Sequence, residues 1–253
     1  MVEPSVVNAD RPSPWRDRAI GHAPSHLRFW IAAAIVLALD LWSKAWVFES
    51  LRPDEVRTII PRVLEFRRSL NDGAVFGSLT GHVELFIAAS VIALGFVLYL
   101  FYGSTSRQSV LHVALGFILA GTMGNLYDRT FQVADVVTHR TASGREQSVI
   151  GRVVSAPDDD VVRVGEWPDG THVQTFPKSA VQIRRQGVVR DFIKFVPKFP
   201  DWVPRLGRRD VWPWIFNLAD GALVCGVAVL LLGSWADRRS THRASAPLLE
   251  NPR

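Results

Sequence analysis

Four apolar segments constrain the fold of this 253-residue chain more than any other feature. They lie at about residues 29–48, 82–102, 110–127 and 214–235. Each approaches the roughly 20 residues that a helix needs to cross a lipid bilayer. A helix of a soluble protein would show a polar stripe, and the run from Leu85 to Phe101 has almost none. The pattern predicts a membrane α-helical protein with four transmembrane helices.

The charge of the chain fits a membrane protein better than a nucleic-acid-binding protein. The net charge is +5, but the arginines are scattered and form no basic face interleaved with aromatic residues. Cys225 is the only cysteine, which excludes an intrachain disulfide and a cysteine-based zinc site. We therefore expect no nucleic-acid partner, no metal and no other cofactor.

Arginines flank the first and last apolar segments and predict the orientation of the chain. The positive-inside rule places both termini in the cytoplasm, because arginines precede the first segment and follow the last: Arg11, Arg16, Arg18, Arg28, Arg238, Arg239 and Arg243. The polar motifs before the second helix, after the third and at the start of the fourth then all lie at the outer face. Their position on one face favours a single site and disfavours a transporter, whose polar residues would line a path across the bilayer.

The stretches outside the helices divide the chain further. Residues 1–28 are polar and predict a disordered cytoplasmic tail, and residues 237–253 predict a second cytoplasmic tail. Residues 29–131 hold the first three helices and a loop with short strands at about 56–69. Residues 132–187 are too long for a linker and predict an inserted extracytoplasmic β-rich subdomain, with strands at 148–154, 160–164, 171–176 and 181–185. Residues 188–236 predict a loop that carries Asp191, followed by the fourth helix.

Two acids at the outer edge of the membrane are the candidate catalytic groups. Asp191 lies in the apolar stretch 188–193, and Asp220 lies at the start of the fourth helix. Two neighbouring carboxylates can share a proton, so that one takes a proton from water while the other donates to the scissile carbonyl oxygen. Each acid also has a structural interpretation, Asp220 as a helix N-terminal acid and Asp191 as an ordinary loop acid. Other hydrolytic routes lack their motifs, since neither Gly-x-Ser-x-Gly nor His-Glu-x-x-His occurs.

Further polar residues occur in the first helix and before the second. Asp40 and Lys44 lie one helical turn apart, so that they share a face and neutralise each other. A structural role that orients the first helix is favoured over direct chemistry for this pair. Asn71-Asp-Gly73 is a strong turn signal just before the second helix.

Two asparagines each precede an aspartate by three positions on a predicted helix. Asn125 precedes Asp128, and Asn217 precedes Asp220, which places each amide on the face of its carboxylate. The amides would orient catalytic groups or substrate, or, for Asn217, cap the helix. Arg129 has two candidate partners, Asp128 and a lipid phosphate.

Taken together, these stretches resemble the lipoprotein signal peptidases (signal peptidase II), which are membrane aspartyl proteases. The likeness covers about 29–131 and 187–236. The matching stretches, in the order of the family, are Asp40-Leu-Trp-Ser-Lys44, Asn71-Asp-Gly-Ala-Val-Phe76, Gly124-Asn-Leu-Tyr-Asp-Arg129, Val188-Val-Arg-Asp-Phe192 and Phe216-Asn-Leu-Ala-Asp220.

The resemblance implies a site, a substrate and a location. Asp191 and Asp220 would form the catalytic dyad, with Asp191 on a catalytic loop, and the residues around them would be Asp40, Lys44, Asn71, Gly73, Asn125, Asp128, Arg129 and Asn217. The substrate would be a diacylglyceryl-modified prolipoprotein, cut just before its lipidated cysteine at the outer face of a bacterial inner membrane. The fold would add a small extracytoplasmic β-cradle near residues 56–76 to the four helices. We expect a monomer that also contacts membrane lipid. The alternative is a catalytically inactive protein of the same fold that binds lipoproteins or lipids.

Two features depart from the family pattern. The family commonly reads Val-Val-Asp-Phe where this chain carries an additional Arg190, but Asp191 is the only acid between Asp169 and Asp201 and keeps its assignment. The insertion at about 133–186 has no role in the family pattern, and the sequence does not assign it one.

Overall fold

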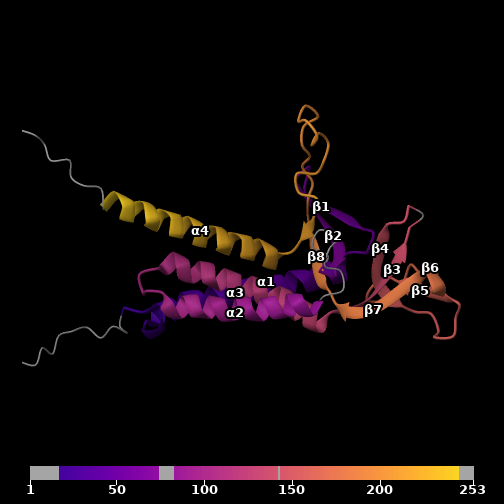
Figure 1. The fold of residues 1–253 in the computed structure, drawn as a ribbon, viewed down its shortest axis with the longest axis horizontal. Helices are drawn as coiled ribbons and strands as arrows, with labels where there is room; N and C mark the ends of the chain where they lie inside the picture. The colour runs from indigo at the N-terminus through magenta and orange to yellow at the C-terminus, as the bar shows by residue number, and fades with distance from the viewer. Residues whose placement is uncertain (1–16, 74–82, 142, 245–253) are drawn as a thin grey trace, which may run out of the picture.

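A bundle of helices carries two β-sheets at one end (Figure 1). The computed structural model describes residues 17–73, 83–141 and 143–244. The helices are η1 (Ala19–Gly21), α1 (Ala23–Ser50), α2 (Val83–Gly103), α3 (Ser109–Phe131) and α4 (Leu218–Ala244), with a second short 3-10 turn, η2 (Lys178–Ala180), in the insertion. Within the described ranges, α1, α2 and α3 are long and apolar enough to cross a membrane, and α4 has a shorter apolar part, Leu218–Gly233. The fold is therefore of membrane type, and a fourth span stays a prediction.

Helix α3 lies at the centre of the bundle and packs against the other three helices. Its side chain Leu115 is fully buried in an apolar cluster with Phe29 of α1 and Phe101 of α2, whose rings stack at 4.4 Å. Near the sheets, a Cβ atom at Gly124 would overlap the Asp40 carboxylate and lie 3.3 Å from the Ala219 Cβ. The missing side chain at position 124 thus lets α1, α3 and α4 approach closely where their polar residues meet.

The first sheet covers the C-terminal end of α1. Its order is β1-β2-β8-β9, formed by β1 (Val56–Ile60), β2 (Leu64–Asn71), β8 (Val189–Phe195) and β9 (Ile215–Phe216). Phe192 and Ile193 of β8 pack on Val47 and Phe48 of α1 in a buried apolar cluster, and burial of such side chains contributes about 1.5–3 kcal/mol each. The hairpin β1–β2 occupies the stretch predicted as the cradle, of which residues 74–76 lie outside the described part.

The second sheet is built from the insertion. Its order is β6-β5-β4-β3-β7, formed by β3 (Val133–Arg140), β4 (Glu146–Val153), β5 (Val161–Gly165), β6 (Gln174–Pro177) and β7 (Val181–Gly187). Val137, Val162 and Val164 form its buried core. Val133 at the start of β3 pairs with Gly187 at the end of β7. The two ends of the insertion therefore lie next to each other. As a result α3, which precedes the insertion, and β8, which follows it, are side by side.

The structure adds one strand to the predicted insertion and corrects the predicted loop at Asp191. The four strands expected in the insertion overlap β4 to β7, but β3 was not expected. The loop expected to carry Asp191 is the strand β8, in which every residue from 189 to 194 is buried. A strand buried on both faces shows no alternation of polar and apolar residues, which removes the usual sequence signal.

Parts of both predicted tails are helical. In the tail assigned to residues 1–28, η1 and the first turn of α1 are ordered, and Ala19 and Ser25 are fully buried. Pro24 lies in the first turn of α1, where a missing amide hydrogen costs little, so proline here starts a helix. In the tail assigned to residues 237–253, α4 continues to Ala244. Residues 1–16 and 245–253 lie outside the described part of the chain.

Candidate active site

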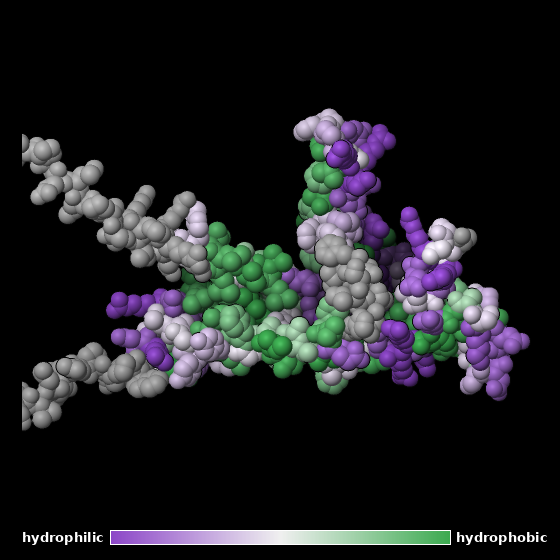
Figure 2. All heavy atoms as spheres, in the orientation of Figure 1, coloured by the Kyte–Doolittle hydropathy of each residue, from purple (hydrophilic) through white to green (hydrophobic). Residues whose placement is uncertain are grey.

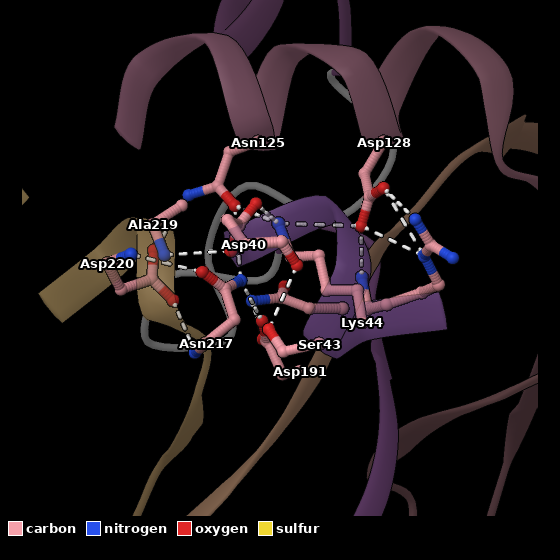
Figure 3. A network of polar contacts seen from close by, with 11 residues as sticks. Asp40, Ser43, Lys44, Asn125, Asp128, Asp191, Asn217, Ala219 and Asp220 are labelled. Atoms are coloured by element: carbon pink, nitrogen blue, oxygen red, sulfur yellow. Dashed lines mark hydrogen bonds and ion pairs between the residues drawn. The ribbon is translucent and has the colours of Figure 1, made fainter. Parts of the chain in front are cut away.

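Five elements bring polar side chains together where the bundle meets the first sheet. Asp40 and Lys44 come from α1, Asn125 and Asp128 from α3, Asp191 from β8, Asp220 from α4 and Asn71 from β2, with Asn217 just before α4. Figure 3 shows most of these side chains pointing toward one another. The structure thus gathers residues that are up to 180 positions apart in sequence, as the hydrogen bond from Ala219 N to Asp40 Oδ1 (2.9 Å) illustrates.

Asp191 is held by two amide side chains. Its residue is 3% exposed, and its Cα position on β8 pairs with Ser69 of β2. Asn71 Nδ2 donates to Asp191 Oδ2 at 3.0 Å, and Asn217 Nδ2 donates to Asp191 Oδ1 at 2.6 Å. Both carboxylate oxygens are therefore fixed, and the carboxyl group has one orientation.

Asp220 both caps α4 and belongs to the site. Asn217 N donates to Asp220 Oδ2 at 3.1 Å, and Asp220 N donates to Asn217 Oδ1 at 3.0 Å, which is a reciprocal capping arrangement. Asn125 Nδ2 donates to Asp220 Oδ1 at 2.8 Å. Asp220 therefore caps the N-terminus of α4 and also lies in the site, so both interpretations from the sequence apply.

The two acids line one cavity of about 490 Å³. This volume falls in the range of pockets that hold small ligands or short peptide segments. Apolar and polar residues both line it: Ser69, Leu70, Asn71, Asp72, Asp191, Trp212, Trp214, Ile215, Phe216 and Asp220. Among the described residues, no cluster of three His, Cys, Asp or Glu side chains is placed to hold a metal ion.

Burial and a second carboxylate change the acidity of Asp191. Its removal from water and the charge of Asp220 together raise the pKa of Asp191 to about 7. The hydrogen bonds from Asn71 and Asn217 oppose this shift. Asp191 therefore keeps its proton to a higher pH than an ordinary aspartate, which is ionised near neutral pH.

A buried ion-pair network between α1 and α3 lies next to the two acids. Lys44 Nζ lies 2.7 Å from Asp40 Oδ2 and 3.6 Å from Asp128 Oδ2, with all three side chains fully buried. Lys44 Nζ also donates to Asn125 Oδ1 at 3.1 Å, which turns the amide nitrogen of Asn125 toward Asp220. The predicted Asp40–Lys44 pair is present, and it connects α1 with α3.

The structure gives Arg190 contacts that the sequence does not predict. Its backbone N donates to Asp128 Oδ2 at 2.9 Å and its Nη2 to Asp128 Oδ1 at 2.8 Å, with Asp128 fully buried. Asp128 thus pairs with Arg190 and Lys44. The Arg129 guanidinium lies 4.7 Å from the ring centroid of Phe86, and its buried Nε has no hydrogen-bond partner within the described residues. The additional residue of β8 therefore supplies the cation that ties this strand to α3.

Gly73 shapes the turn that presents Asn71. Its φ is +89°, and its N donates to Asn71 Oδ1 at 2.9 Å, so that the Asn71 amide nitrogen is left to reach Asp191. A Cβ at Gly73 would lie 2.7 Å from Phe86 Cε2. Both the backbone conformation and the close approach of this ring require glycine.

Gly73→Ala is expected to destabilise the protein by more than about 1 kcal/mol and to reduce activity, because strain at φ above zero and the clash with Phe86 add. Gly144→Ala is a matched control, since Gly144 has a φ of +77° and an added Cβ would meet nothing within 4 Å. Thermal unfolding of both purified variants measures the difference. Equal destabilisation would show that the Phe86 contact contributes nothing.

Comparisons with known proteins identify the family and agree with the fold. A family model described as "Signal peptidase (SPase) II" matches residues 32–236. The lipoprotein signal peptidase of Desulfitobacterium hafniense (strain DSM 10664 / DCB-2) is 25% identical over 203 residues, which cover 80% of this chain and 89% of the relative. That of Syntrophomonas wolfei is 38% identical over 106 residues, 42% of this chain and 70% of the relative.

Solved structures of bacterial membrane enzymes share the fold. A bacterial membrane enzyme solved at 2.3 Å by the in meso method superposes with a TM-score of 0.53 and 19% identity, covering 94% of this chain and 98% of that one. A second, solved at 1.9 Å, gives 0.52 and 20%, covering 86% and 95%. Since the family match spans most of the sequence and includes every element of the site, the chain belongs to the signal peptidase II family and is a membrane protease.

Proposed function

We propose that this protein is an aspartyl endopeptidase that removes the signal peptide from diacylglyceryl-modified prolipoproteins, cutting just before the lipidated cysteine. The observation that carries the proposal is the placement of Asp191 and Asp220 on one cavity, each with its carboxylate oriented by amide groups. The names of the relatives support the class of substrate. The apolar residues that line the cavity, among them Trp212, Trp214 and Phe216, suit a lipidated substrate.

The chemistry follows from the unequal environments of the two acids. Asp220 takes a proton from a water molecule, whose oxygen attacks the scissile carbonyl carbon, while Asp191 donates its proton to the carbonyl oxygen. The tetrahedral intermediate then collapses: Asp220 returns its proton to the leaving nitrogen, the C–N bond breaks, and Asp191 recovers a proton from the hydroxyl group that becomes the new carbonyl. Asn71, Asn125 and Asn217 hold the two carboxyl groups in place throughout.

We infer four membrane spans with both termini in the cytoplasm and the site at the outer face of the inner membrane. Helix α1 begins and α4 ends at the end of the bundle opposite the sheets, which supports termini on one side (Figure 1). The arginines at both ends of the helical region support that side as the cytoplasm. The protein would act as a monomer in contact with membrane lipid. A catalytically inactive binding protein is not favoured, because both acids and their amide partners are in place.

Cleavage of a defined precursor tests the proposal. The purified full-length protein is incubated with a prolipoprotein peptide that carries diacylglycerol on its lipobox cysteine, and with the same peptide unmodified. We expect cleavage of the first alone, with the lipidated cysteine as the new N-terminus in mass spectrometry. Cleavage at another bond, or equal cleavage of both peptides, would refute the assignment of the substrate.

The pH profile of this reaction is expected to fall on the alkaline side of neutrality. The pKa of Asp191 is raised to about 7, and the mechanism needs its proton. Above that pH, kcat/KM should therefore decline by about tenfold per pH unit, as expected for one essential acid. Initial rates at low substrate concentration between pH 6 and 9 measure the profile. A constant kcat/KM over this range would contradict the role of Asp191 as the acid.

A further inference from the structure

A structured hairpin projects from the first sheet between β8 and β9. It consists of residues 197–213, here named the arm, and is drawn in orange at the top of Figure 1. Its two sides are joined by backbone hydrogen bonds from Phe199 N to Arg209 O (2.9 Å) and from Val211 N to Pro197 O (2.9 Å). At its base, Lys194 Nζ lies 2.7 Å from Asp210 Oδ2 and donates to the backbone oxygens of Trp212 and Pro213. The backbone hydrogen bonds within the arm and the contacts of Lys194 at its base therefore fix the direction in which the arm projects.

The arm leaves the molecule sideways at the level where the helices end. Figure 1 shows it roughly perpendicular to the axis of the bundle, so in a membrane crossed by the helices it runs along the bilayer surface. Figure 2 shows hydrophobic atoms along the side of the arm that faces the helices and hydrophilic atoms on the opposite side. Its exposed large hydrophobic side chains are Trp202, Leu206, Val211 and Trp212, with Trp202 82% exposed. In a membrane crossed by the helices, the apolar side of the arm would therefore face the acyl chains of the bilayer.

The charges of the arm are mostly positive. With Lys194 it holds five cations, Lys194, Lys198, Arg205, Arg208 and Arg209, against two acids, Asp201 and Asp210, which gives a net charge of +3. Both acids are engaged by cations, Asp210 by Lys194 and Asp201 by Arg208, whose Nε lies 3.0 Å from Asp201 Oδ1. Basic residues that border an apolar, tryptophan-containing surface match the headgroup region of an anionic bilayer, with phosphates above and acyl chains below.

We propose that the arm docks on the outer leaflet, with Trp202 and Leu206 at acyl-chain depth and Lys198, Arg205 and Arg209 on the phosphates of anionic phospholipids. The geometry also connects this surface to the cavity, because Trp212 at the base of the arm and Trp214 beside it line the cavity with Asp191 and Asp220. If the proposed function holds, a substrate whose diacylglycerol lies in the same leaflet reaches the acids along the arm without leaving the bilayer.

Site-directed fluorescence on the full-length protein tests the docking without any cleavage assay. The only native cysteine is removed by Cys225→Ser, and a probe is attached through Trp202→Cys. The matched control is Thr175→Cys in β6 of the insertion, an exposed position on an exposed strand. Both proteins are placed in nanodiscs of phosphatidylcholine with or without phosphatidylglycerol. Quenching is measured with brominated acyl chains and with aqueous acrylamide.

We expect brominated acyl chains to quench the probe at position 202 at least twice as strongly as the probe at position 175, and acrylamide to show the reverse order. Removing phosphatidylglycerol, or introducing Lys198→Glu, Arg205→Glu and Arg209→Glu together, should reduce acyl-chain quenching at 202. Equal acrylamide quenching at both positions would overturn the docking. Acyl-chain quenching that is indifferent to phosphatidylglycerol would overturn the anionic headgroup assignment. Because no outcome depends on proteolysis, failure here is separate from failure of the proposed function.

Discussion

Asp191→Asn and Asp220→Asn are each expected to lower kcat/KM for a lipidated precursor by about 100- to 10,000-fold, the usual contribution of a general acid or base. Asparagine keeps the size of the side chain but can neither take a proton from water nor donate one to a carbonyl oxygen. Because the two acids act as a unit, the double variant should be hardly slower than either single variant. Asp158→Asn, at an exposed turn of the insertion, is the matched control and should cleave normally.

Loss of activity in Asp191→Asn is not expected to come from loss of the fold. The pKa of Asp191 is raised by burial to about 7 from an ordinary value near 3.8, so the folded state favours the protonated form. Stability from this group is complete below pH 3.8 and is lost as the pH rises toward 7. At pH 8 the folded wild type therefore holds an unfavourable buried charge that asparagine lacks. Thermal unfolding at pH 8 should show the variant at least as stable as the wild type, and a large loss would mean that the side chain is structural.

Sequence spacing predicts those contacts of the site whose two residues lie three or four positions apart on a helix or at its start. Asp40 and Lys44 form their pair because positions one turn apart on a helix share a face. Asn217 and Asp220 form a reciprocal cap because the spacing of three places side chain and amide within reach. These contacts depend on local geometry, which sequence spacing determines.

The contacts made by Arg190 could not be predicted in the same way. Its partner Asp128 lies 62 positions earlier, beyond the whole insertion, and the contact exists because β3 and β7 pair at Val133 and Gly187. Nothing in the spacing of residues shows that the insertion begins and ends at one point. The strand β8 was equally hidden, because burial on both faces removes the alternation that identifies a strand. The stretch that forms the arm is rich in proline, tryptophan, lysine and arginine, which is typical of an interfacial segment. Its direction depends on Lys194 and on backbone pairing, which the composition does not show.

Lys44→Met is expected to cost about 3–5 kcal/mol of stability, the usual effect of removing one partner from a buried ion pair. Lys44 and Asp40 are both fully buried at 2.7 Å, and methionine fills a similar volume without a charge, so that the Asp40 carboxylate keeps only the Ala219 N–H. Adding Asp40→Asn should restore most of the loss, because the uncompensated charge then disappears. Arg163→Met, which breaks an exposed pair with Asp159, should cost less than about 1 kcal/mol. Thermal unfolding in detergent compares the variants. A double variant no more stable than Lys44→Met would mean that the lysine acts through its contacts with Asn125 and Asp128 rather than by neutralising Asp40.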